Sequence, residues 1–115
     1  KVYKFELTFS LMAYKTRKRS PMEIIYSMLS SCNNECGITK MIYGAAVNYL
    51  VAQKYINELI KIGALKVENK EDKKYYKVTE KGKLLMQHLE EFLKLRQSLD
   101  NTLDKVKEFL YLEEK

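Results

Sequence analysis

The last third of the chain carries an apolar heptad pattern that a small domain cannot bury by itself. Steps of four and three residues alternate along the pattern, whose positions are Leu85, Leu89, Phe92, Arg96, Leu99, Leu103, Val106 and Leu110. This spacing predicts one helix over residues 80–112, about 50 Å long at 1.5 Å per residue. Because such a stripe requires a partner helix, we expect these positions to form a dimer interface with a second copy of the chain. The heptads alone leave parallel and antiparallel pairing open.

The positive charge of the chain is concentrated in front of this helix. Residues 1–83 carry 16 lysines and arginines against 8 acidic residues, whereas residues 84–115 carry 5 against 7, which gives a formal net charge of +6. The 115 residues, 46% of them hydrophobic, suffice for one domain with a modest core. A basic protein favours an acidic partner, and both nucleic acid and an anionic membrane fit this charge.

Membrane insertion and export have no support in the sequence. No run approaches the ~18 to 20 uncharged residues of a membrane span. The apolar N-terminal stretch carries Lys4 and Glu6, where a signal peptide is uninterrupted. We therefore expect a cytoplasmic protein without a membrane partner.

The first 19 residues contain an alternating segment followed by a basic arm. Residues 3–11 alternate apolar and polar side chains with a strict period of two, which predicts a half-buried strand. Its partner is not evident, and the same strand of a second copy is one candidate. The arm that follows is too polar to fold alone and contains Lys15, Arg17, Lys18 and Arg19.

Three helices are predicted between residues 20 and 62. Ser20, Pro21 and Glu23 form a capping box with a favoured proline, and the first helix buries Ile24, Ile25, Met28 and Leu29 before it ends in "SSCNNECG". A second, short helix is expected from about Thr39, as its cap, to Ala45 or Ala46. Asn48 then caps a third helix. Its apolar face contains Ala52, Tyr55, Ile56, Leu59 and Ile60, and its polar face contains Leu50, Lys54, Asn57 and Lys61, with Gln53 at the border.

A charged hairpin separates these helices from the heptad helix. Gly63 is placed to end the third helix in a left-handed conformation. Two β-prone runs, "ALKVE" and "YYKV", then flank a tip with Glu71 and Asp72 as turn formers, and Thr79 caps the last helix. The order of helix, short helix, helix, hairpin and long helix predicts a mostly α fold with a small β-hairpin, a winged helix-turn-helix. We expect a winged-helix domain at residues 20–83 and a dimerising coiled-coil helix at residues 84–115.

Neither a metal site nor an active site is indicated. Cys32 and Cys36 lie in "SCNNECG", and the one histidine, His88, is distant in sequence, whereas a zinc site normally needs four ligands. Buried free thiols are the preferred interpretation. A disulfide is the alternative, because lysines outnumber arginines 18 to 3, a bias reported for hyperthermophiles, whose intracellular proteins contain disulfides. No catalytic triad, glycine-rich phosphate loop or paired carboxylates occur, so we expect no enzyme, no cofactor and no small-molecule substrate.

Three segments also resemble a known family. The stretches "RSPMEIIYSML", "GITKMIYGAAVNYLVAQKYINELIKIGAL" and "KYYKVTEKGKLL" are similar to the archaeal winged-helix proteins of the Sulfolobus ten-a DNA-binding type, over about residues 19–99. The resemblance implies a winged helix that dimerises through a C-terminal antiparallel coiled coil. It also implies DNA binding without catalysis, in a chromosome-associated packaging protein or a transcriptional regulator. Residues 1–11 lie outside the pattern.

A winged helix places its third helix in the DNA major groove, and its hairpin tip reaches the flanking backbone or the minor groove. We expect basic side chains to contact phosphates, namely Lys15, Arg17, Lys18, Arg19, Lys40, Lys70, Lys73 and Lys74. We expect the third helix to contact base edges through Asn48, Tyr49, Gln53, Lys54 and Asn57. Leu50 departs from the polar type expected there, and either touches a thymine methyl or packs on protein.

The sequence thus predicts a homodimeric double-stranded DNA-binding protein. A protein–protein interaction module with a coiled-coil scaffold is the alternative, motivated by Leu50 and the N-terminal strand.

Overall fold

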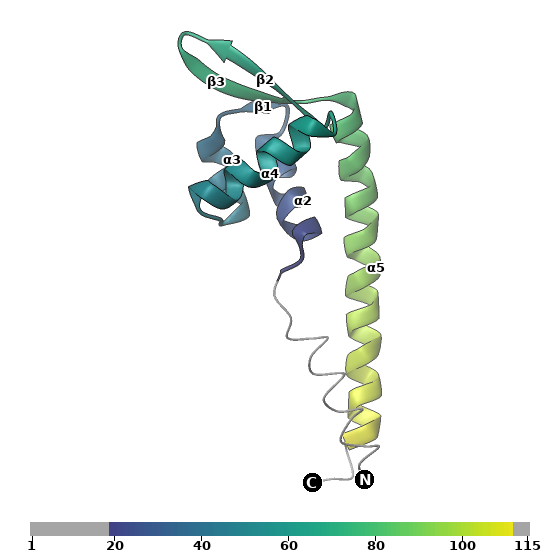
Figure 1. The fold of residues 1–115 in the computed structure, drawn as a ribbon. Coiled ribbons are helices and arrows are strands. Elements are labelled where there is room, and N and C mark those ends of the chain that lie inside the picture. Colours follow the sequence, from purple (N-terminus) through teal and green to yellow (C-terminus); the bar gives the residue numbers. More distant parts are fainter. Residues whose placement is uncertain (1–18, 112–115) are drawn as a thin grey trace. The chain divides into compact units, whose positions relative to one another are not determined.

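The structure is a computed structural model that describes residues 19–111 (Figure 1). Its elements are α2 (Pro21–Cys32), β1 (Glu35–Cys36), α3 (Ile38–Ala45), α4 (Tyr49–Lys61), β2 (Leu65–Lys70), β3 (Lys73–Val78) and α5 (Glu80–Tyr111). Residues 20–91 form one compact unit, and the part of α5 from Phe92 onward belongs to a second unit. The predicted strand over residues 3–11 and three arm residues, Lys15, Arg17 and Lys18, lie outside the described residues.

The capping box at the start of α2 is confirmed. Ser20 Oγ accepts a hydrogen bond from the Glu23 amide at 3.3 Å, and the Glu23 carboxylate accepts one from the Ser20 amide at 2.9 Å. Met28 and Leu29 are fully buried, while Ile24 and Ile25 are half-buried against the core, as the apolar spacing predicts.

The predicted cap of the second helix is wrong by two residues. α3 begins at Ile38 with Gly37 as its N-cap, and Gly37 has no side chain with which to form a capping hydrogen bond. Thr39 is an exposed residue inside the helix. The reason lies in the preceding residues: Cys36 is held in β1, so the chain passes from an extended Gly37 directly into the helix.

The strand β1 is absent from the sequence-based prediction, and it widens the hairpin into a three-stranded antiparallel sheet of order β1-β3-β2. β1 has two residues, with Glu35 opposite Lys77 and Cys36 opposite Tyr76. So short a strand has no detectable alternation in sequence. It is stabilised by β3, because the Val78 amide also donates a hydrogen bond to the Asn34 carbonyl at 2.9 Å.

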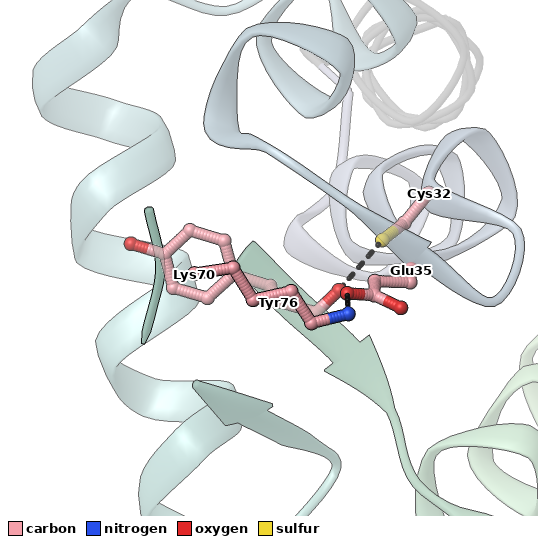
Figure 2. Close-up of polar contacts among 4 residues, drawn as sticks. All are labelled: Cys32, Glu35, Lys70 and Tyr76. Carbon is pink, nitrogen blue, oxygen red and sulfur yellow. Dashed lines mark hydrogen bonds and ion pairs between the residues drawn. The ribbon is translucent and has the colours of Figure 1, made fainter. Parts of the chain in front are cut away.

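Cys32 and Cys36 form a disulfide, so the preferred prediction of free thiols is wrong and the alternative is correct. The chain reverses after α2 at Asn33, whose φ is +66°, and this reversal brings the two Cα atoms to 5.1 Å, a separation typical of disulfides. Both cysteines are buried in the core, and Cys32 Sγ lies 3.5 Å from the Tyr76 carbonyl oxygen (Figure 2).

The core of the first unit lies between the helices and one face of the sheet. Its buried residues come from every element from α2 to β3, and are Met28, Leu29, Cys32, Cys36, Met41, Ala45, Ala52, Ile56, Leu59, Ala64, Leu65, Tyr76 and Val78. The buried face of α4 agrees with its predicted apolar face. Gly63, the second residue after α4, has a φ of +87°, which confirms the predicted left-handed stop.

The junction between the hairpin and α5 is closely packed. Thr79 Oγ1 accepts a hydrogen bond from the Gly82 amide at 3.0 Å, which confirms the predicted cap, and its hydroxyl donates to the Gly63 carbonyl at 2.6 Å. The Thr79 amide donates to the Ala64 carbonyl at 3.1 Å. α5 then continues without interruption to Tyr111, which confirms the long C-terminal helix. The predicted last residue, Leu112, lies beyond the described range.

Candidate nucleic-acid interface

The outer face of α4 is the first part of the candidate interface. Leu50, Lys54 and Asn57 follow one another at steps of four and three residues, so they share one face of the helix, and all three are exposed. Gln53 is half-buried at the border of this face, as predicted. The helix is thus fixed by its buried side and presents a mixed apolar, amide and cationic surface on the other.

The first turn of α4 is ordered by Asn48. Its Oδ1 accepts a hydrogen bond from the Val51 amide at 2.8 Å, which confirms the predicted cap. The side-chain oxygen of Asn48 therefore already has a partner within the protein. Tyr49, which follows it, is 58% exposed.

Two amides in the second and third turns of α4 are linked to each other, and one of them is linked to the sheet. Gln53 Nε2 donates a hydrogen bond to Asn57 Oδ1 at 3.4 Å. Gln53 also lies beside the Tyr76 hydroxyl of β3. Burial raises the pKa of Tyr76, with a smaller contribution from Tyr49, while the hydrogen bond with Gln53 opposes this rise. The recognition-helix candidate and the central strand of the sheet are thereby coupled through polar side chains.

The hairpin of β2 and β3 forms the second part of the interface. Glu71 and Asp72 occupy its exposed tip with φ angles of +50° and +65°, as in a type I′ turn, so their predicted role as turn formers is confirmed. Lys70 pairs with Lys73 across the strands, and Asn69 pairs with Lys74. Because side chains alternate along a strand, Lys74 lies on the same face as buried Tyr76, and Lys70 lies on the opposite face.

Lys70 has an acidic partner within the protein. Its Nζ lies 2.8 Å from Glu35 Oε2, and Figure 2 shows the side chain reaching toward this carboxylate. It also lies 5.9 Å from the centre of the Tyr75 ring. The hydrogen bond to Glu35, followed by the charge of Glu35, raises the pKa of Lys70 above its ordinary value. The contact joins β1 to the hairpin tip, and it reduces the positive charge that Lys70 presents to an anion.

Lys70 is paired with Glu35, whereas Lys74 lies on the opposite face of the hairpin, and this difference leads to a first prediction for DNA binding. Lys74→Ala is expected to lower the slope of log affinity against log salt by about 0.9, the contribution of one phosphate contact, and Lys70→Ala by clearly less. Glu35→Gln, which releases Lys70, is expected to strengthen binding at low salt. Fluorescence anisotropy across a salt series measures all three variants. Equal losses in Lys70→Ala and Lys74→Ala would contradict this assignment.

A concave surface joins the two parts of the interface. It encloses about 450 Å³ between the start of α3, the start of α4 and strand β3. Tyr49, Gln53, Lys73 and Lys74 contribute to its lining together with Thr39. Four of the predicted contact residues, Tyr49, Gln53, Lys73 and Lys74, therefore border this concave surface. The other predicted helix and hairpin residues, Asn48, Lys54, Asn57 and Lys70, are not part of its lining.

Comparisons with known proteins agree with this architecture. A family model described as a winged helix-turn-helix matches residues 18–97. The chain belongs to the winged helix-turn-helix family. It is 51% identical to Sso10a-2, a DNA-binding protein from Sulfolobus solfataricus, over 80% of this chain and 97% of that chain, with a TM-score of 0.77. This similarity confirms the resemblance to the Sulfolobus ten-a type.

More distant winged-helix structures share the fold. F93 from STIV, a winged-helix DNA-binding protein, is 24% identical, with a TM-score of 0.56 over 67% of this chain and 92% of that chain. BpsR from Bordetella bronchiseptica is 11% identical, with a TM-score of 0.63 over 98% of this chain and 89% of that chain. No curated protein matches the chain significantly.

The remaining predicted phosphate contacts of this winged helix-turn-helix protein are not among the residues that line the concave surface, or they lie outside the described range. Arg19 and Lys40 are exposed, and Lys40 belongs to α3. The arm residues Lys15, Arg17 and Lys18 are not among the described residues. Sequence reasoning missed the role of Glu35 as a partner of Lys70, because no local pattern relates residues 35 positions apart.

The eight predicted seam residues of α5 differ in how exposed their side chains are. Leu89 is buried, and Leu85, Arg96, Leu103 and Leu110 are half-buried. The other three seam residues, Phe92 (38%), Leu99 (51%) and Val106 (42%), are exposed. Two exposed apolar residues outside the predicted seam, Leu95 (64%) and Phe109 (90%), lie on the same side of the helix. We call these five residues the exposed stripe. Their spacing of three, four, seven and three residues follows the a and d positions of a heptad.

The described residues contain no group of three or more His, Cys, Asp or Glu side chains that could hold a metal ion. Over the same part of the chain, no helix has the length and apolar character needed to cross a membrane.

Proposed function

We propose that this winged-helix protein binds double-stranded DNA, with α4 in the major groove and the hairpin on the flanking backbone. The observation that carries the proposal is the concave surface that Tyr49 and Gln53 of α4 line together with Lys73 and Lys74 of β3. A helix of this kind fits the major groove, and lysines beside it neutralise phosphates. The 51% identity with a DNA-binding protein of Sulfolobus solfataricus supports the same assignment.

We further propose that the protein acts as a homodimer through residues 84–115. The exposed stripe supports this proposal, because an isolated helix with large apolar side chains at a and d positions leaves them in water. A second copy would cover the stripe and would present two α4 helices to related half-sites. In this arrangement residues 20–83 are the DNA-binding domain, and the basic arm within residues 1–19 adds phosphate contacts. The protein would then be cytoplasmic and chromosome-associated.

The test is binding to a random duplex and to a genomic fragment library across a salt series. A steep salt dependence with little sequence preference is expected for a packaging protein, whereas tight binding to few fragments is expected for a regulator. Each phosphate contact adds about 0.9 to the slope. Absence of binding at low salt would contradict the proposal. It would favour a protein–protein interaction module, for which the exposure of Tyr43 (80%) and Leu50 (77%) provides an apolar surface.

A further inference from the structure

Leu50 is the feature of the α4 surface that phosphate binding does not explain. It is the second residue of α4 and is 77% exposed, so it is not part of the core that fixes the helix. Lys54 and Asn57 follow it on the same face. If α4 occupies the major groove as proposed above, its N-terminal turn faces the base edges, and Leu50 faces them with an isobutyl group.

The neighbouring amides have hydrogen-bonding partners within the protein. Asn48 Oδ1 accepts from the Val51 amide at 2.8 Å, and Gln53 Nε2 donates to Asn57 Oδ1 at 3.4 Å. Contacts to bases through these atoms would compete with bonds already formed. Leu50 loses no hydrogen bond on contact with a base, and the contact is favourable because it removes apolar surface from water.

The major groove presents one apolar group, the C5-methyl group of thymine. We propose that Leu50 is a specificity-determining residue that contacts this methyl group and gives the protein a preference for thymine in each half-site. The inference rests on the proposed DNA-binding function and adds the chemical group that is recognised. It assigns sequence preference to an apolar contact and not to the amides of α4.

The test uses two duplexes of equal length, one of alternating dA and dT and one of alternating dA and dU, which differ only in the C5-methyl group. The full chain, Leu50→Ala and Leu84→Ala are each titrated with both duplexes at one salt concentration. Leu84 is a matched control, because it is a leucine with 57% exposure on α5 that belongs neither to the predicted seam nor to the exposed stripe. Circular dichroism of each variant establishes that the helices are retained.

The wild-type protein and Leu84→Ala are expected to bind the dT duplex more tightly, by about fourfold per half-site, which corresponds to ~0.8 kcal/mol for one buried methyl-sized group. Leu50→Ala is expected to bind both duplexes equally. Equal binding of the two duplexes by the wild-type protein would overturn the methyl contact and leave the DNA-binding function intact. A preference that survives in Leu50→Ala would assign recognition to another group and would also overturn it. No binding to either duplex at low salt would overturn the DNA-binding function itself.

Discussion

Leu99→Asp is expected to convert the proposed dimer into monomers and to weaken DNA binding by about 100-fold. Leu99 lies in the middle of the exposed stripe, where it is 51% exposed, so the change leaves the fold of one chain intact. In a paired helix it would place a carboxylate against apolar side chains, at a desolvation cost that pairing cannot offset. Loss of the second binding domain removes the gain from linked binding, which is typically about 10² to 10⁴ in affinity. Sedimentation equilibrium and anisotropy at one salt concentration measure the two effects.

The control for this variant is Gln97→Glu. It adds the same charge on the side of α5 opposite to the exposed stripe, where Gln97 is exposed and donates a hydrogen bond to Asn101. It is expected to remain a dimer and to bind DNA almost as the wild type does. A Leu99→Asp protein that remains dimeric would show that the exposed stripe is not the interface. A monomer that binds DNA as tightly as the wild type would separate dimerisation from DNA binding.

Gly82→Ala is expected to lower the free energy of unfolding by ~1–3 kcal/mol, the range for overpacked sites. Gly82 is buried in the first turn of α5, and a Cβ there would overlap the Ala64 carbonyl oxygen and lie 2.9 Å from Val78 Cγ1. The same carbonyl accepts the hydrogen bond from the Thr79 amide, so it cannot move without a loss at the helix cap. The better helix propensity of alanine offsets this only in part. Guanidinium denaturation at a fixed protein concentration measures the change.

Gly37→Ala is the matched control for this substitution. Gly37 has a φ of −87°, and an added Cβ would meet no described atom within 4 Å. Its free energy of unfolding is expected to fall by about 0.5–1 kcal/mol, less than that of Gly82→Ala, because alanine is a poorer N-cap residue than glycine but meets no steric overlap here. Equal destabilisation by the two substitutions would mean that the overlap at Ala64 is relieved at little cost.

The elements whose signals are local could be predicted from the sequence. The capping box of Ser20 and Glu23, the Asn48 and Thr79 caps and the left-handed Gly63 all involve residues within a few positions of one another. Each is specified by side chains that satisfy the backbone groups of the adjacent turn. The start of α3 was misplaced because its cap is glycine, which has no side chain to reveal it.

The candidate site could be predicted in part. The exposed face of α4 follows from its period, because the opposite face had to be buried. The predicted seam of α5 did not include Leu95 and Phe109, which are exposed apolar residues. The helix has two overlapping apolar sides, and the heptad period alone does not indicate which of them is exposed. The partner of Lys70 was missed for another reason, which is that Glu35 reaches it only through the short strand β1.

The sequence by itself determined the order of helices and hairpin, the ends of most elements and the winged helix-turn-helix fold. These features depend on hydrophobic period and capping, which act over one or two turns. The tertiary structure decided that Cys32 and Cys36 are joined, that Glu35 is paired with Lys70 and that the exposed stripe remains open. The disulfide and the ion pair depend on how the chain reverses after α2 and on the pairing of β1 with β3, and no local pattern of residues encodes either.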